Sequence, residues 1–166
     1  AGGFAGGGTT YTANITPSGA GVVTVSVAAN AAVDASANGN TASNILSRTF
    51  DNSDPSVVIT STATEPTNVS PIPVTITFNE SVTGFVVGDI TVTNGTAGSL
   101  TGSGTTYSAV ITPTAAGLVT INVAANAAND VANNGNTVSN TLSITYDNSP
   151  PTVSITTTAT NPTGTS

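Results

Sequence analysis

The stretch Pro73-Val74-Thr75-Ile76-Thr77-Phe78 alternates apolar residues with Pro or Thr, and this period of two residues decides the fold. Successive side chains of a β-strand point to opposite faces of a sheet, so the alternation predicts a strand with one buried face. The same period continues on both sides of this stretch, carried mainly by Val, Ile and Tyr. The sequence therefore predicts an all-β protein.

Seven short strands, A to G, are predicted between Asp51 and Tyr146, separated by Gly, Pro and Asn-Gly turn sequences. The Ala-rich residues 124–132 are interrupted by Asn and are interpreted as an F–G loop with at most one helical turn. Seven antiparallel strands without covering helices indicate a two-sheet sandwich of immunoglobulin type, with Tyr107, Tyr146 and Phe78 as its largest core residues. The strands are marked by residues 57–59, 74–78, 90–92, 97–101 (the weakest), 107–111, 119–123 and 142–146.

The chain repeats itself at a spacing of 96 residues: Gly8-Thr9-Thr10-Tyr11 returns as Gly104-Thr105-Thr106-Tyr107. Without gaps, residues 1–70 match residues 97–166 at 44 of 70 positions. We interpret residues 1–50 as the C-terminal part of one repeat (strands D to G), 51–146 as a complete repeat, and 147–166 as the linker and first strand of a third. Tandem copies of one domain are typical of long arrays, and a window on a longer polymer is expected.

The composition excludes several classes of function. With one Arg, no Lys, no His and a formal charge of -7, the chain has no electrostatic basis for nucleic-acid binding. Because His, Cys and Lys are absent, it cannot build a catalytic triad, a thiolate metal site or a disulfide framework, and we expect no enzyme activity. No apolar run approaches the ~20 residues of a spanning helix, so no transmembrane segment is expected here.

Residues 73–85, residues 89–95 and the Tyr-Asp-Asn-x-x-Pro linker that starts at Tyr146 resemble the bacterial Ig-like repeats of large surface adhesins. The resemblance covers essentially the whole chain. It implies a secreted or cell-surface array of domains in a bacterium, and it names no ligand.

The acids of the complete repeat are predicted to gather at one pole. An odd number of antiparallel strands puts the two ends of a domain at opposite poles, and it returns the B–C, D–E and F–G loops to the N-terminal pole. Glu65, in the A–B loop, is the exception. Asp34 and Asp147 are the F–G loop and linker acids of the neighbouring copies. The acids expected at the N-terminal pole are Asp51 and Asp54 in the linker, Glu80 at the end of B, Asp89 at the start of C and Asp130 in the F–G loop.

Unpaired carboxylates repel one another by ~1 kcal/mol or more per close pair, and a bound cation removes that repulsion. Oxygen ligands, with Asn134 and Asn136 as neutral partners, favour Ca²⁺ over Zn²⁺ or Cu²⁺. The resemblance implies the same, since related repeats bind Ca²⁺ between a linker Asp and an F–G loop Asp. The F–G loop here reads Asp-x-x-x-Asn-Gly-Asn instead of the family's Asp-x-Ala-Gly-Asn, and Pro150 replaces Asp54 in the next linker, so Asp54 is an auxiliary ligand at best. The alternative is ordinary turn chemistry, in which Asp and Asn cap backbone amides.

Together these observations predict a structural repeat of an extended extracellular stalk or filament on a bacterial surface, rigidified by Ca²⁺ between domains. The alternative is a carbohydrate- or surface-binding module, although the F–G loops of the two copies keep Asp and Asn-Gly-Asn at matched positions. The partners expected are neighbouring repeats of the same chain.

The exposed edges of the sheets are open to pairing with other chains, and this chain has little charge to prevent it. Either prolines such as Pro71 and Pro73 guard the edges, or the chains associate laterally into fibres.

Overall fold

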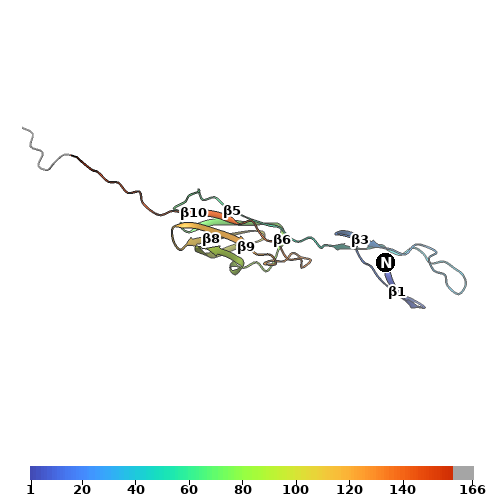
Figure 1. The fold of residues 1–166 in the computed structure, drawn as a ribbon. Helices are drawn as coiled ribbons and strands as arrows, with labels where there is room; N and C mark the ends of the chain where they lie inside the picture. Colours follow the sequence, from blue (N-terminus) through green and yellow to red (C-terminus); the bar gives the residue numbers. More distant parts are fainter. Residues whose placement is uncertain (159–166) are drawn as a thin grey trace, which may run out of the picture.

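A computed structural model describes residues 1–158 of the chain. Those residues form strands and one short 3₁₀ turn, and no helix among them is long and apolar enough to cross a membrane. In Figure 1 the complete repeat lies in the middle, the linker from β4 reaches one of its ends, and the chain leaves at the other. The strands of the complete repeat are β5 (Val57–Ser61), β6 (Ile72–Val82), β7 (Ile90–Thr93), β8 (Gly95–Pro113), β9 (Gly117–Val123) and β10 (Leu142–Tyr146), with the 3₁₀ turn at Val87–Asp89.

The complete repeat is a sandwich of two antiparallel sheets, with strand orders β5-β6-β8 and β10-β9-β7. Burial along β6 alternates as the sequence predicts, because every second side chain faces the opposite sheet. The all-β, immunoglobulin-like prediction is confirmed. The expectation that a proline guards a sheet edge is wrong for Pro73, because β6 is the central strand of its sheet and Pro73 lies opposite Val110.

Strand β8 contains the two segments predicted as strands D and E. The chain folds back at Gly104, which has φ +67° and is the equivalent of Gly8 in the turn between the two arms of the first copy's hairpin. Gly102, with φ +104°, lies in the first arm, where a Cβ would collide with the backbone of Thr106. The equivalent hairpin of the first copy is resolved into β1 (Gly2–Gly7) and β2 (Thr10–Asn14), which pair antiparallel. The sheet of the complete repeat therefore has the order A-B-E-D of immunoglobulin domains.

The core is aliphatic, with three aromatic rings at one end. Phe78, Phe85 and Tyr107 meet edge to face, with ring centroids 5.1–5.9 Å apart, and the Tyr107 hydroxyl donates to the Val82 carbonyl at 3.3 Å. The predicted core residues Phe78 and Tyr107 are buried, whereas Tyr146 is only half-buried. Phe85 is a core residue that the strand pattern missed, because it lies in the B–C loop.

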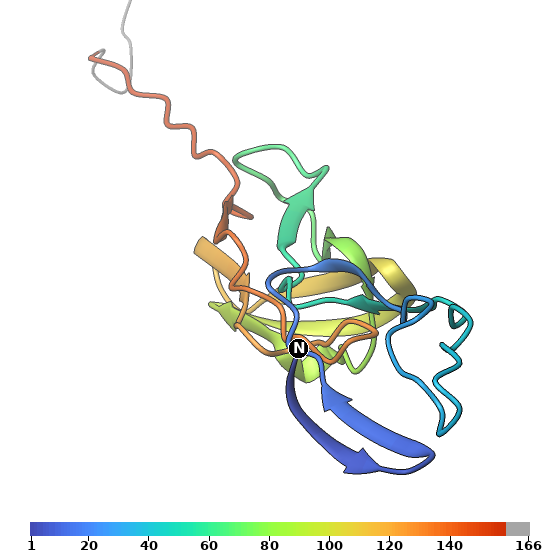
Figure 2. The same ribbon diagram turned by 90° about the vertical axis from the view of Figure 1, so that its right-hand side faces the viewer.

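Residues 1–50 form two separate pairs of strands, β1 with β2, and β3 (Gly21–Val25) with β4 (Leu46–Phe50). Figure 2 shows the β1–β2 hairpin projecting away from the sandwich. Residues 147–158 contain no strand, and the rest of the predicted first strand of a third repeat, residues 159–166, lies outside the described residues.

Candidate metal site at the N-terminal pole

Three segments converge at the N-terminal pole of the complete repeat. The first is the linker, whose buried Pro55 accepts a hydrogen bond at its carbonyl from the N–H of Thr137, at 2.8 Å. The second is the start of the B–C loop, where Thr83 exchanges two backbone hydrogen bonds with Asn129, at 2.8 and 3.0 Å. The third is the F–G loop, which contains Asn129 and Thr137. These contacts agree with the predicted return of the B–C and F–G loops to this pole.

The F–G loop has no helical turn, and its shape comes from side-chain hydrogen bonds. Asn136 is buried; its Oδ1 accepts the N–H of Ala128 at 2.7 Å, and its Nδ2 donates to the carbonyls of Ala124 and Thr137. A Cβ at Gly135 would collide with the side chain of Asn126. The Asn-Gly-Asn sequence therefore builds the loop, because each residue type is needed for a contact within it.

Asp130 is buried in this loop with its oxygens already hydrogen-bonded. Its Oδ1 accepts the N–H groups of Ala132 and Asn134, both at 2.8 Å, and its Oδ2 accepts Nδ2 of Asn134 at 2.9 Å. The side-chain hydrogen bond from Asn134, helped by backbone N–H groups, lowers the pKa of Asp130 below its ordinary value, although burial opposes the shift. Asp130 is therefore held as a carboxylate.

Asp51 of the linker and Glu80 of β6 lie beside Asp130, and one carboxylate oxygen of each of the three residues lies within 4.8 Å of the others. Asn134 connects two of these segments, since its Nδ2 also donates to the backbone carbonyl of Asp51 at 3.3 Å. The only basic side chain of the protein, Arg48, donates to the carbonyl of Ser47. Three carboxylates at this spacing could hold a metal ion, and oxygen ligands suit a hard cation.

The other predicted site residues lie outside this group. Asp89 accepts the N–H of Val86 through Oδ2 at 2.8 Å and so closes the 3₁₀ turn before β7. Asp54 is exposed. Asp147 accepts the N–H of Ser149 at 2.9 Å in the following linker, as Asp51 accepts that of Ser53 at 3.0 Å. Asp34 repeats the Asp130 geometry in the first copy, where hydrogen bonds from the Asn38 side chain and backbone lower its pKa.

Two polar contacts at the strand edges were not visible in the sequence. The Asn140 side chain accepts the N–H of Ile59 at 2.8 Å and donates to the Ile59 carbonyl at 3.0 Å, as a neighbouring strand would. Glu65, at the opposite pole to the acidic group, accepts the N–H of Thr145 at 2.8 and 2.9 Å with its two oxygens. No periodic pattern marks such residues, because each depends on the one direction in which its side chain points.

A family model described as "Bacterial Ig-like domain" matches residues 51–146, which is more than half of the chain and is the predicted complete repeat. No curated protein and no solved structure matches the chain.

Proposed function

Because the chain belongs to the bacterial Ig-like domain family, we propose that it is a repeating unit of an extended extracellular stalk or surface filament, in which Ca²⁺ at each N-terminal pole rigidifies the linker. Domains of this family are typically non-catalytic structural modules and are generally extracellular or surface-exposed. The observation that carries the proposal is the convergence of a linker carboxylate, Asp51, with Glu80 and Asp130 of the folded domain.

The path of the chain supports a linear array. The linker reaches the complete repeat at one pole and the chain leaves it at the other, so that successive repeats extend the molecule instead of folding back (Figure 1). The linkers on the two sides carry the same Asp-Asn-Ser sequence and the same turn, with Ser53 and Ser149 donating to the preceding Asp. A junction that recurs with the repeat gives every domain the same orientation to its neighbour.

The acidic group supports a cation at this junction. Glu80 and Asp130 belong to the sandwich and its F–G loop, whereas Asp51 belongs to the chain that arrives from the preceding repeat. A hard ion bound to all three would join the linker to the domain and remove the repulsion between the carboxylates. Ca²⁺ takes 6–8 oxygen ligands, so water and backbone carbonyls would complete its shell.

The strand edges favour a stalk over an edge-paired fibre. The free edge of β5 is covered by the amide of Asn140, and the free edge of β10 is capped by Glu65 and by a parallel bridge between Thr67 and Tyr146. The edge segment at the start of β8 is irregular, with Ser99 at φ +49°. These features protect the edges at β5, β10 and the start of β8 without Lys, which is the usual residue for that role.

The test is a Ca²⁺ titration of the full chain and of two variants, Asp51→Asn and Asp147→Asn. A cation present at 100 times its Kd stabilises the folded state by ~2.7 kcal/mol, or at least about 10 °C in Tm for a domain of this size. We expect that rise in the wild type and in Asp147→Asn, which alters the same linker sequence on the other side of the domain. Asp51→Asn should lose most of it.

Small-angle scattering of the same samples tests the stiffening. We expect Ca²⁺ to lengthen and narrow the distance distribution of the wild type but not that of Asp51→Asn. Identical melting and scattering curves in Ca²⁺ and in chelator would reject the cation. The capping of backbone amides in turns would then be the only role of the acids.

A further inference from the structure

The first and last strands of the complete repeat meet at a seam between the two sheets. β5 and β10 are edge strands of different sheets, so no ladder of a common sheet joins them. The other seam, between β7 and β8, is closed by the chain itself, because only Asn94 separates those two strands. The contacts between β5 and β10 and their flanking residues therefore decide how firmly the sandwich is closed at this seam.

Two of these contacts lie in the half of the seam that is nearer the N-terminal pole. The carbonyl of Pro55, just before β5, accepts the N–H of Thr137 at 2.8 Å. Further along, the Asn140 side chain accepts the N–H of Ile59 at 2.8 Å and donates to its carbonyl at 3.0 Å. The segment that leads into β10 thus holds the beginning and the middle of the β5 segment.

At the opposite pole the A–B loop holds the end of β10. Glu65 accepts the N–H of Thr145 with both carboxylate oxygens. The buried Thr67 donates its N–H to the Thr145 carbonyl at 2.9 Å, accepts the N–H of Asp147 at 2.8 Å and forms a parallel bridge with Tyr146. The contacts advance in the same direction along both segments, so the first and last strands run parallel from the N-terminal pole.

Tension along an array would reach the domain through these two segments. The linker arrives at the N-terminal pole and the chain leaves at the opposite one (Figure 1). Tension therefore draws β5 toward the N-terminal pole and β10 toward the other, and it slides the two parallel segments past each other. All the contacts across the seam are then loaded together, and they break whichever of the two strands leaves first.

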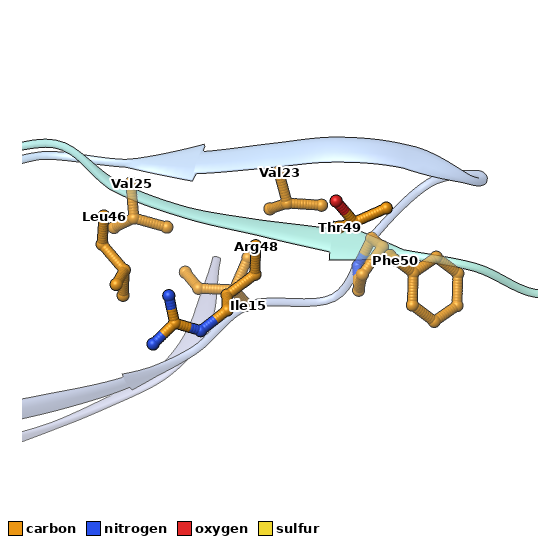
Figure 3. Close-up of a pocket in the computed structure, with 8 residues that line it drawn as sticks. Ile15, Val23, Val25, Leu46, Arg48, Thr49 and Phe50 are labelled. Atoms are coloured by element: carbon orange, nitrogen blue, oxygen red, sulfur yellow. The ribbon is translucent and has the colours of Figure 1, made fainter. Parts of the chain in front are cut away.

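The side-chain contacts of the seam are separate from the packing of the core. Glu65 and Asn140 are exposed, and each binds backbone groups at a free strand edge. Core packing uses one face of a strand instead: in β4, the equivalent of β10, Figure 3 shows Leu46 and Arg48 on one face and Thr49 on the other. Substituting Glu65 or Asn140 therefore removes seam contacts without opening a cavity in the core.

We propose that the seam is a load-bearing clamp, in which Glu65 and Asn140 hold the first and last strands together against tension along the chain. The two side chains act reciprocally, since each belongs to one loaded segment and binds the backbone of the other. Glu65 is the one acid of residues 51–146 at the pole opposite the acidic group, and the clamp gives it a role there. The inference rests on the proposed stalk, which supplies the tension, and it needs no cation.

The test is unfolding of the full chain at constant force in chelator, with thiol handles at Ser53→Cys and Ser149→Cys. The protein has no Cys of its own, and these two exposed residues are equivalent in the two linkers. Glu65→Ala and Asn140→Ala should each raise the unfolding rate under tension at least about fivefold, the factor expected for one net hydrogen bond. A similar factor should appear in the folding equilibrium constant in denaturant, because bonds broken at the barrier affect the unfolding rate in full.

Ile111→Ala is the control for a loss of stability away from the seam. Ile111 is 0% exposed and lies in β8, which neighbours neither β5 nor β10. This variant should lower the folding equilibrium constant more than the clamp variants do, yet raise the unfolding rate under tension less, because the core is still closed when the seam breaks. Glu65→Gln, which keeps one oxygen acceptor, should fall between the wild type and Glu65→Ala.

An unfolding rate under tension that rises no more in the two clamp variants than in Ile111→Ala would overturn the clamp. That result would leave the Ca²⁺ titration of the linker unaffected, because no cation is present in the force experiment. A chain that shows no response to Ca²⁺ should still rupture at the seam. The clamp and the cation therefore fail separately.

Discussion

The two copies of the F–G loop differ in their surroundings but not in their structure. In the complete repeat Asp130 is buried beside the linker, and in the first copy Asp34 is exposed. Both nevertheless accept the same hydrogen bonds: Asp34 from the N–H groups of Ser36 and Asn38 at 2.8 and 2.9 Å, and from Nδ2 of Asn38 at 3.0 Å. The loop is therefore specified by its own residues, and sandwich packing is not needed to shape it.

The strands show the opposite behaviour. β3–β4 and β9–β10 pair in the same register, yet the first pair leaves Val23 and Val25 half-buried while their equivalents, Val119 and Ile121, are 0% exposed. Pairing is local in the sequence, whereas burial needs the distant strands β5 and β6. The comparison separates what the loop sequence specifies by itself from what only the complete sandwich provides.

The largest expected effect comes from the matched substitutions Ile111→Ala and Ile15→Ala. Ile111 is 0% exposed, so its truncation should leave a cavity and cost about 2–5 kcal/mol of unfolding free energy, which is at least about 10 °C in Tm. Ile15 is 41% exposed and belongs to no closed core, so the same change should leave the main transition where it is. Thermal unfolding followed by circular dichroism measures both.

Equal destabilisation by the two variants would mean that residues 1–50 share a cooperative core with the complete repeat. The two variants delete the same atoms, so any difference between them reports packing and not residue type.

The sequence predicted the strands from the alternation of apolar residues, and it predicted the pole at which the acids gather from the number of strands. It placed Asp51, Glu80 and Asp130 at one pole, where the structure brings them together. It did not reveal that Asp89 closes a 3₁₀ turn instead of joining that group. Side-chain directions in irregular segments depend on single dihedral angles, which no repeating pattern encodes.

The sequence pattern also failed to predict which loop residue is buried in the core and which strands are neighbours in a sheet. Phe85 is buried through the fold of the B–C loop, and Pro73 lies in a central strand although proline is usually found at edges. Spacing indicated which residues form β6, but the order of strands in a sheet is a long-range property. The roles of Asn140 and Glu65 belong to the same class, since both bind backbone about 80 residues away in the sequence.

An intermediate effect is expected from Asn140→Ala compared with Asn44→Ala. Removing the Asn140 amide breaks two hydrogen bonds to Ile59 and exposes the free edge of β5, at a cost of about 1–2 kcal/mol. Asn44 clamps no strand, so its substitution should not move the transition. Chemical denaturation gives both free energies.

The Asn140→Ala variant should also lose amide protection at Ile59 in hydrogen exchange while the central strand β6 stays protected. Unchanged protection at Ile59 would show that the amide is incidental to the position of β5.

The smallest effect is a pH dependence that Asp130 should show and Asp34 should not. Hydrogen bonds from Asn134 lower the folded-state pKa of Asp130 below its ordinary value of 3.8, so the folded state favours the carboxylate more than the unfolded state does. This contribution to stability is complete above the ordinary pKa and is lost as the pH falls through the lowered one. Asp130→Asn should therefore flatten the acid side of the stability profile, measured in metal-free buffer from pH 7 to pH 3.

Asp34, whose pKa is lowered in the same way, lies in the copy without a closed core, so Asp34→Asn should keep the wild-type profile of the main transition. Asn134→Ala, which removes the strongest of these hydrogen bonds, should fall between the two. A profile that Asp34→Asn and Asp130→Asn flatten equally would show that the loop of the first copy unfolds together with the complete repeat, and would remove the distinction between the two copies.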